Sequence, residues 1–249
     1  MKDLPLEFVK KVKDVINKQK MIEGEVEKTI KDGQEYWIQK SIMPIYDDNI
    51  RVGEVIVNYD ITEKKKLEQL ALRDGLTGLY NRRFFDETLK KEISRVARKK
   101  KKLSFFILDV DFFKKYNDSY GHEVGDEALV AVSHEVKKAL HRGGDFAFRV
   151  GGEEFGALFS DTNVENSLKM VNKIRKNIEA LQIEHSNSQT AKYITVSIGL
   201  LVVDFSQESV DAHGFYTMAD DALYQAKDSG RNRVVLYEND DIDFFLNEK

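Results

Sequence analysis

The sequence predicts an α/β fold, an α+β sandwich in which helices cover both faces of one mixed central sheet. Two observations lead to this expectation. Helical and strand patterns alternate beyond residue 74, and the strand-like runs at 145–150 and 154–160 flank a Gly-Gly pair, which is a β-hairpin signal. A hairpin that interrupts the alternation favours a sheet with antiparallel neighbours over a doubly wound parallel sheet.

The expected elements of the N-terminal part follow from local patterns. Residues 6–20 carry apolar side chains at helical spacing, and residues 34–46 and 51–62 are β-rich runs joined by a polar turn. Residues 62–73 are charged and helix-favouring, and they contain neither proline nor glycine. We therefore expect a small β segment over residues 1–61, followed by a helical linker at 62–73 that transmits orientation.

Residues 74–240 contain the alternation and are expected to form the main domain. The expected elements are a helix at 82–100, a strand at 103–109, a helix at 124–141, the hairpin, a helix at 163–182, a strand at 192–203, a helix at 215–228 and a strand at 233–238. Residues 241–249 form a tail that contains two phenylalanines, for which docking on the domain and disorder are both open.

The composition excludes several classes of protein. With 249 residues, 41% of them hydrophobic, the chain can bury the core of one large domain, or of one domain plus a smaller one. The absence of cysteine excludes disulfide scaffolds and cysteine nucleophiles, and the net charge of −4 is not that of a general nucleic-acid binder. The apolar runs are too short to cross a bilayer and the start lacks a signal-peptide pattern, so we expect a cytoplasmic protein.

Acidic residues lie where the apolar run at 103–108 ends, in the sequence Asp109-Val110-Asp111. Carboxylates at the end of a buried strand are well placed to hold Mg²⁺, a hard cation that prefers oxygen ligands and usually shares them with phosphates. The turn after such a strand also exposes backbone N–H groups that can bind phosphates.

The hairpin turn adds two glycines and two further acids, Glu153 and Glu154. Glycine lets the backbone approach a ligand closely. Adjacent carboxylates on a strand point to opposite faces, so at most one of these two joins a given metal cluster from the strand, and the other acts from the turn or from the other side. Together with the acidic strand end, the turn predicts metal-assisted phosphoryl or nucleotidyl transfer.

Four motifs in this order resemble those of the GGDEF-domain diguanylate cyclases over roughly residues 72–237. They are residues 74–83 (DGLTGLYNRR), 109–126 (DVDFFKKYNDSYGHEVGD), 149–155 (RVGGEEF, the GGEEF variant) and 227–232 (KDSGRN). The resemblance implies a nucleotidyl-cyclase-like fold and the condensation of two GTP into cyclic di-GMP and two pyrophosphates. It also implies Mg²⁺ or Mn²⁺, two ions per active half-site, and a homodimer in which each domain binds one GTP.

The resemblance assigns roles to residues of this chain. It implies three metal ligands, namely Asp109, the carbonyl of Val110, and Glu153. It implies a substrate-binding set that reads guanine or binds phosphate, namely Asn117, His122, Asp126, Phe112, Phe113, Lys227 and Arg231. It implies a catalytic set of Glu153, Glu154 and Lys114, in which Glu154 activates or positions the 3′-hydroxyl and the division of roles between the two glutamates stays open.

Upstream of the signature, Arg142 and Asp145 fit the family's Arg-x-x-Asp inhibitory site, which binds cyclic di-GMP. Arg175, on the following helix, is a further candidate for that site. A surface ion pair is the alternative interpretation of Arg142 and Asp145. Asp74 and Asn81 are expected to serve mainly as caps.

Four histidines lie outside these motifs. They are expected to be solvent-exposed or packing residues, because their spacing is not that of metal ligands: His134, His141, His185 and His213.

Residues 36–45 and 52–62 resemble the C-terminal half of a PAS sensor domain, including the Asp60-Ile61-Thr62 end before a signalling helix. The opening strands and early helices of that fold have no counterpart before Met1. The resemblance therefore implies a truncated or degenerate sensor, and no PAS cofactor is carried over.

Two rival functions are considered. One is a catalytically silent receptor for GTP or cyclic di-GMP, against which the intact Glu153, Glu154 and Asp109 argue. The other is a cyclase with relaxed base choice, against which Asp126 argues, because an acid accepts hydrogen bonds from guanine N1–H and N2–H whereas adenine offers no such pair.

Overall fold

The computed structural model describes residues 26–31, 34–47, 50–140, 143–160, 162–207 and 209–238. The chain divides into two compact units, Met1–Ala71 and Leu72–Lys249. The expected helix at 6–20, the tail at 241–249 and the candidate Arg142 lie outside the described residues.

The first unit contains an antiparallel sheet with the order β1-β2-β3, formed by β1 (Val26–Lys31), β2 (Gln34–Asp47) and β3 (Ile50–Asp60). Both expected β-rich runs are strands. The helix α2 (Thr62–Ala71) follows. Thr62 joins the helix to the sheet, because its hydroxyl accepts from the Trp37 amide at 2.9 Å while its own amide donates to Asp60 at 2.9 Å.

The second unit is built on a five-stranded mixed sheet with the order β5-β6-β4-β7-β8. The strands are β4 (Lys102–Val110), β5 (Phe146–Arg149), β6 (Glu154–Ser160), β7 (Val196–Asp204) and β8 (Val234–Leu236). Only β7 and β8 pair in parallel; the other neighbours are antiparallel, and β5 and β6 form the expected hairpin. The predicted fold class is confirmed.

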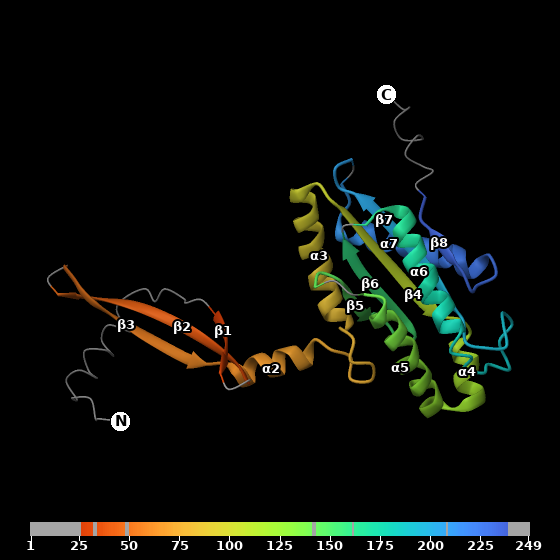
Figure 1. Ribbon diagram of the computed structural model, residues 1–249, viewed down its shortest axis with the longest axis horizontal. Helices are drawn as coiled ribbons and strands as arrows, with labels where there is room; N and C mark the ends of the chain where they lie inside the picture. The colour runs from red at the N-terminus through yellow and green to blue at the C-terminus, as the bar shows by residue number, and fades with distance from the viewer. Residues whose placement is uncertain are drawn as a thin grey trace. The chain divides into compact units, whose positions relative to one another are not determined.

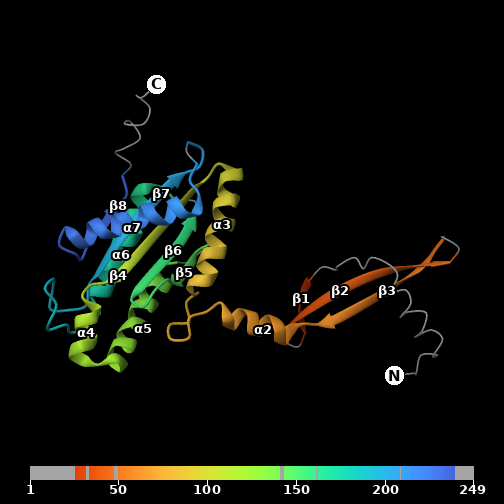
Figure 2. The same cartoon turned by 180° about the vertical axis from the view of Figure 1, so that it is seen from behind.

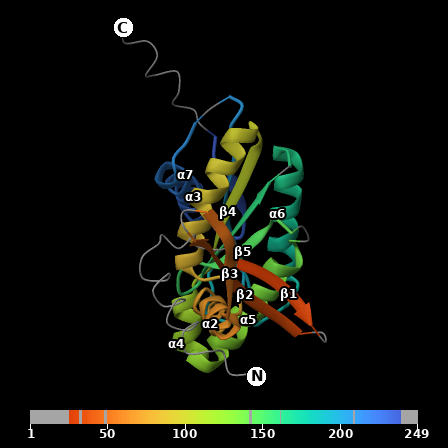
Figure 3. The same ribbon diagram turned by 90° about the vertical axis from the view of Figure 1, so that its left-hand side faces the viewer.

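Helices cover both faces of this sheet. They are α3 (Arg82–Lys99), α4 (Phe113–Tyr120), α5 (His122–Lys138), α6 (Val164–Glu179) and α7 (Ala212–Asp228). In Figure 1 α5 and α6 lie in front of the sheet, and in Figure 2 α7 does. Figure 3 shows α3 and α7 on one side of the sheet and α6 on the other.

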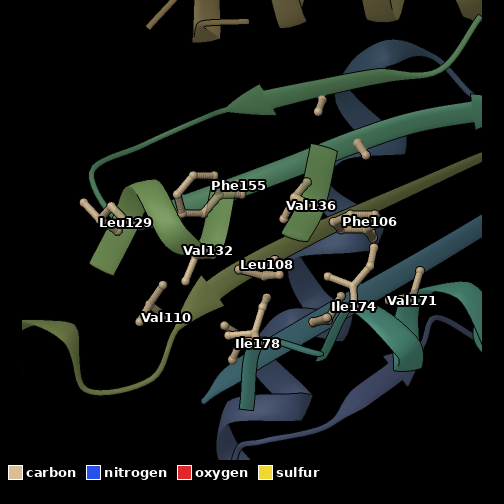
Figure 4. Close-up of a cluster of buried hydrophobic side chains, with 14 of the residues drawn as sticks. Phe106, Leu108, Val110, Leu129, Val132, Val136, Phe155, Val171, Ile174 and Ile178 are labelled. Atoms are coloured by element: carbon tan, nitrogen blue, oxygen red, sulfur yellow. The ribbon is translucent and has the colours of Figure 1, made fainter. Parts of the chain in front are cut away.

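Side chains of β4 alternate between two cores, which explains its uninterrupted apolar run. Phe106, Leu108 and Val110 pack against α5 and α6 in the cluster of Figure 4, whereas Phe105 and Ile107 pack in the second cluster with α3 and α7. Asp109 therefore leaves the sheet on the α7 face. Gly199 of β7 brings α7 close to this face, because a Cβ there would overlap the backbone of Ala219 and Leu223.

Several boundaries differ from the prediction, and β1 and α4 have no counterpart in it. The strand expected at 192–203 begins at Val196. Residues 183–194 instead form a closed loop, in which Ile194 N donates to the Ile183 carbonyl and His185 N to the Lys192 carbonyl, both at 2.8 Å.

Candidate active site

Acidic groups from two strands meet where β4 ends beside the hairpin turn. Asp109 is paired across the sheet with Glu154, the first residue of β6, so both side chains emerge on the same face. Glu153 lies in the turn itself, and the Val110 amide donates to its carbonyl at 3.3 Å. Glu154 thus projects from the strand, and Glu153 projects from the turn.

Burial strongly affects the carboxyl group of Asp109. Only 13% of its side chain is exposed, and burial raises its pKa to about 6. The charges of Glu153 and Glu154 also raise this pKa, while Lys227 opposes the rise through an ion pair in which its Nζ lies 2.8 Å from Asp109 Oδ2. A desolvated carboxylate beside two others is a place where a cation relieves repulsion.

The donors at this place fit a hard divalent cation. Asp109, Glu153 and the Val110 carbonyl offer only oxygen. Within the described part of the chain, no three histidine, aspartate or glutamate side chains are grouped closely enough to hold a metal ion by themselves. A Mg²⁺ ion bound here would therefore complete its shell with water or with substrate phosphate, as Mg²⁺ usually does.

Beside the acids, the turn after β4 presents a helix N-terminus. Phe112 has φ 57° and precedes α4 without any side-chain cap, so the first-turn amides of α4 are left for a ligand or water. These amides lie at the positive end of the helix dipole. Three cationic side chains accompany them: Lys114 is exposed, Lys227 reaches Asp109, and the Arg231 Cζ lies 4.4 Å from the Phe112 ring centroid.

The helices α4 and α5 carry the residues implied to read guanine. Asn117 lies on α4, and its Oδ1 is buried and has no hydrogen-bond partner in the part of the chain that the structure describes. It lies directly against Gly125 of α5, where a Cβ would overlap that oxygen. His122 and Asp126 are on α5 and exposed. An unpaired buried acceptor of this kind costs about 1–3 kcal/mol, which a ligand that donates a hydrogen bond would recover.

Asp111 is a residue of this site whose role sequence reasoning missed. It is 1% exposed, and its carboxylate accepts from the hydroxyls of Thr195 at 2.8 Å and Ser197 at 2.6 Å. It also accepts from the amide of Asn232 at 3.1 Å. Asn232 and the preceding Arg231 both have positive φ, 46° and 64°. Asp111 therefore fixes the strained turn that carries Arg231.

Arg149 stabilises the turn between β5 and β6, residues 150–153, which we call the signature turn. Its Nε and Nη2 donate to the Gly152 carbonyl at 3.0 and 2.7 Å, and its Nη1 pairs with Asp74. Asp74 in turn accepts from the amide and the hydroxyl of Thr77. Asn81 caps α3 by accepting from the Phe84 amide, as expected. Asp74 is not the helix cap that was expected: residues 75–77 are a turn, α3 begins only at Arg82, and Asp74 stabilises that turn and binds Arg149.

Two candidate residues of the implied inhibitory site, Asp145 and Arg175, have different surroundings. Asp145 lines a cavity of about 690 Å³ together with Lys169 and Lys173 of α6. Arg175 is not among the lining residues, because its guanidinium points elsewhere and donates to Glu179 at 3.0 Å and to Asn232 at 2.6 Å. Arg175 thus belongs with the turn fixed by Asp111. The lysines have the spacing i, i+4, which sequence reasoning did not use.

Known proteins similar to this chain point to one family. A family model described as diguanylate cyclase, GGDEF domain, matches residues 71–233. The probable diguanylate cyclase DgcT of Escherichia coli K12 is 36% identical over 169 residues, which is 68% of this chain and 36% of that protein. The probable diguanylate cyclase DgcC of the same strain is 32% identical over 201 residues, 80% of this chain and 53% of that protein. The chain therefore spans about a third to a half of the length of these relatives.

Solved structures show the same similarity. The GGDEF domain of DgcB from Caulobacter crescentus, solved in complex with c-di-GMP, has a TM-score of 0.61 and 32% identity, covering 68% of this chain and 97% of that one. The active GGEEF domain of a diguanylate cyclase from Vibrio cholerae has a TM-score of 0.55 and 31% identity, covering 64% and 97%. No helix in the described part of the chain is long and apolar enough to span a membrane.

Proposed function

The chain belongs to the diguanylate cyclase GGDEF-domain family, and from this premise we propose that it condenses two GTP into cyclic di-GMP and two pyrophosphates. The observation that carries the proposal is the meeting of three features in one place. These are the crowded carboxylates around Asp109, the uncapped N-terminus of α4, and the unpaired Asn117 oxygen. Together they offer sites for a cation, for phosphates and for a base.

The residues divide the work of binding. Asp109, Glu153 and the Val110 carbonyl would hold Mg²⁺, which when bound supplies Lewis-acid stabilisation of charge on the phosphate oxygens. We expect two ions in each active half-site. The amides at the start of α4, with the side chains of Lys114, Lys227 and Arg231, bind and orient the triphosphate.

Base recognition is assigned to the α4–α5 pair. Asn117 and Asp126 face the guanine edge, where Asp126 accepts from the N1–H and N2–H donors, and His122 lines the same pocket. Glu154, on the face of the sheet that carries Asp109, positions or activates the 3′-hydroxyl that attacks the other nucleotide. Because each domain binds one GTP, the reaction requires two copies of the chain facing one another.

We assign residues 1–61 to a PAS-like sensor segment, residues 62–73 to a signalling linker, and residues 74–240 to the catalytic domain with its tail at 241–249. The three-stranded antiparallel sheet of the first unit and the helix α2 are compatible with this division. The signal would act by changing how two catalytic domains meet, since the reaction depends on their pairing.

Product feedback is the second part of the proposal. Cyclic di-GMP would bind at Arg142 and Asp145, and the structure places Asp145 in a cavity that Lys169 and Lys173 also line. Two cationic side chains beside a carboxylate suit a ligand that has two phosphates and two guanine edges. The GGDEF domain of DgcB was solved in complex with this ligand, and this chain is similar to that domain. The similarity supports the proposal that this chain binds cyclic di-GMP.

The test is turnover of GTP by the purified protein with Mg²⁺, with the products resolved by mass spectrometry. Wild type is expected to form cyclic di-GMP and pyrophosphate, with specific activity that rises with protein concentration until the dimer saturates. Glu153→Gln removes the charge of a metal ligand with nearly no change of volume, and it should lower the rate more than about a hundredfold.

Glu87→Gln is the matched control, because Glu87 is an exposed residue of α3 whose carboxylate lies 3.5 Å from Arg83 Nε, away from the candidate site. It should leave the rate unchanged. GTP binding without any turnover would replace the cyclase proposal by the silent receptor. Formation of mixed or adenine products from GTP and ATP would support relaxed base choice.

A further inference from the structure

His185 is a buried side chain that contacts the phosphate-binding turn without belonging to any of the motifs. It is 1% exposed, and its ring lies edge-on against Tyr116 of α4 at 5.2 Å and 86°. Its Nε2 lies 3.3 Å from the carbonyl oxygen of Phe112. The loop at 183–194 carries the ring and is closed by its own backbone hydrogen bonds. His185 therefore reaches α4 from a loop with an independent structure.

His185 contacts Phe112, a residue with an unfavourable backbone conformation. Phe112 has φ 57° and ψ 30°, a left-handed conformation that bulky residues disfavour. Its carbonyl already accepts from the Tyr116 amide at 3.1 Å, so His185 occupies the remaining acceptor position. The direction of this carbonyl sets the direction of the Phe113 N–H, the first amide of α4, since the two belong to one planar peptide unit.

We propose that His185 is a positioning residue for phosphate binding, which holds the Phe112 turn by donating a hydrogen bond from Nε2 to its carbonyl. In this arrangement the first amides of α4 are directed towards the phosphates of GTP before GTP arrives. The inference rests on the proposed function, because it gives a role to the turn that this function uses. It concerns phosphate affinity and not base selectivity.

The state of the imidazole agrees with this role. Burial lowers the pKa of His185, and the charge of Lys115 lowers it further, while the hydrogen bond to Phe112 opposes them. The ring is therefore neutral at neutral pH and carries one N–H. Its Nδ1 is buried and has no hydrogen-bond partner among the described residues, so the proton belongs on Nε2, where it meets an acceptor.

The same loop is joined to the other end of α4 by contacts that do not involve Phe112. The Tyr120 hydroxyl donates to Ser186 Oγ at 2.9 Å and accepts from the Ser186 amide at 3.0 Å. Removing this hydroxyl weakens the attachment of the loop but leaves the Phe112 carbonyl bonded. Tyr120→Phe is thus a control for loosening of the loop as such.

The experiment compares His185→Leu, His185→Gln and Tyr120→Phe in the full chain. Leucine fills the buried space without a donor, whereas glutamine places an amide N–H near the position of Nε2. We expect His185→Leu to raise the KM for GTP and the dissociation constant of inorganic pyrophosphate about tenfold each, with the GTP/ATP preference unchanged. Glutamine should restore most of the affinity, and Tyr120→Phe should stay within about twofold of wild type.

Two further measurements make the outcome decisive. Nitrogen-15 shifts of wild type should show a neutral His185 protonated on Nε2, and the opposite tautomer would overturn the proposal even if the leucine variant does not fold. Unchanged pyrophosphate affinity in folded His185→Leu, or equal losses in His185→Leu and Tyr120→Phe, would also overturn it. If wild type binds pyrophosphate but forms no cyclic di-GMP, the proposed function is contradicted. The role of His185 is then still decided by comparing the pyrophosphate affinities of the variants.

Discussion

Arg149 pairs with Asp74 across 75 residues of sequence, with its Nη1 lying 3.0 and 3.2 Å from the two carboxylate oxygens. The other nitrogens of the same guanidinium donate to the Gly152 carbonyl in the signature turn. Only 15% of the Arg149 side chain is exposed, so the pair is partly shielded from water. The first motif of the domain therefore acts as the support of the turn that carries Glu153.

Asp74→Asn tests this support. Burial raises the pKa of Asp74, but hydrogen bonds from Thr77 and the charge of Arg149 outweigh it and hold that pKa below 3.8. Because the folded-state pKa is depressed, the stabilisation is present above pH 3.8 and is lost as the pH falls through the folded value. The variant should be less stable by about 1–2 kcal/mol at pH 7, with a smaller difference in acid.

Urea unfolding at pH 7 and at a series of acidic pH values measures this difference. The rate of cyclic di-GMP formation should also fall about tenfold in Asp74→Asn, because the signature turn loses its anchor. A stability difference that stays constant on acidification would show that the carboxylate charge does not contribute.

Gly125→Ala should weaken the recognition of guanine. A Cβ at position 125 would overlap Asn117 Oδ1, so the amide of Asn117 has to move away from the base. We expect the GTP/ATP preference to fall about tenfold. The loss of stability should be limited, because alanine is more favourable than glycine within a helix. Competition kinetics with both nucleotides measures the preference.

Gly214→Ala is the control for the helix effect. Gly214 is in the first turn of α7, where a Cβ would approach Asp211 at 3.2 Å and not a residue of the base site. It should leave the preference unchanged. An unchanged GTP/ATP ratio in Gly125→Ala would remove Asn117 from base reading.

Asp109→Asn should separate stability from activity. The folded pKa of Asp109 is about 6 against an ordinary value of 3.8, so the metal-free folded protein retains a proton that the unfolded chain has lost. Its stability therefore falls as the pH rises through this window. At pH 8 and without metal, Asp109→Asn should be more stable than wild type by about 1–2 kcal/mol, yet form no product.

Unfolding in the presence of a chelator at pH 5 and pH 8 measures this gain. Asp204→Asn serves as the control, because hydrogen bonds from Ser206 lower the pKa of Asp204, so this substitution should not stabilise the protein. A metal-free Asp109→Asn protein that is less stable than wild type at pH 8 would show that the Lys227 ion pair outweighs burial.

Local patterns predicted the sheet, the hairpin and most helices, because each depends on spacing within about 20 residues. The helix α4 escaped prediction because it has only eight residues, and β1 because three of its six residues are charged. The role of Asp111 could not be predicted, since its partners Thr195, Ser197 and Asn232 lie 84, 86 and 121 residues away. His185 was expected to pack or to be exposed, and its hydrogen bond to Phe112 depends in the same way on the tertiary fold.

The last prediction concerns the face of α6 that we propose binds cyclic di-GMP. Lys169 and Lys173 line the cavity with Asp145, whereas Arg175 is engaged by Glu179 and Asn232. Helical periodicity placed Lys169, Lys173 and Arg175 on one helix but did not say which face of that helix meets which neighbour. Substitution by alanine should therefore have different effects at Lys169 and Lys173 than at Arg175.

Lys173→Ala and Arg142→Ala should each raise the inhibitory concentration of cyclic di-GMP about tenfold, with initial rates at low product nearly unchanged. Arg175→Ala should instead raise the KM for GTP, because Asn232 and the turn that carries Arg231 lose a partner at 2.6 Å. Inhibition should be non-competitive with GTP, since the ligand favours an arrangement in which the two GTP sites are apart. Calorimetry on nucleotide-stripped protein measures the binding of cyclic di-GMP directly. Equal binding by wild type and Lys173→Ala would exclude this cavity as the binding site. Loss of binding in Arg175→Ala alone would show that the site lies on the other face of α6.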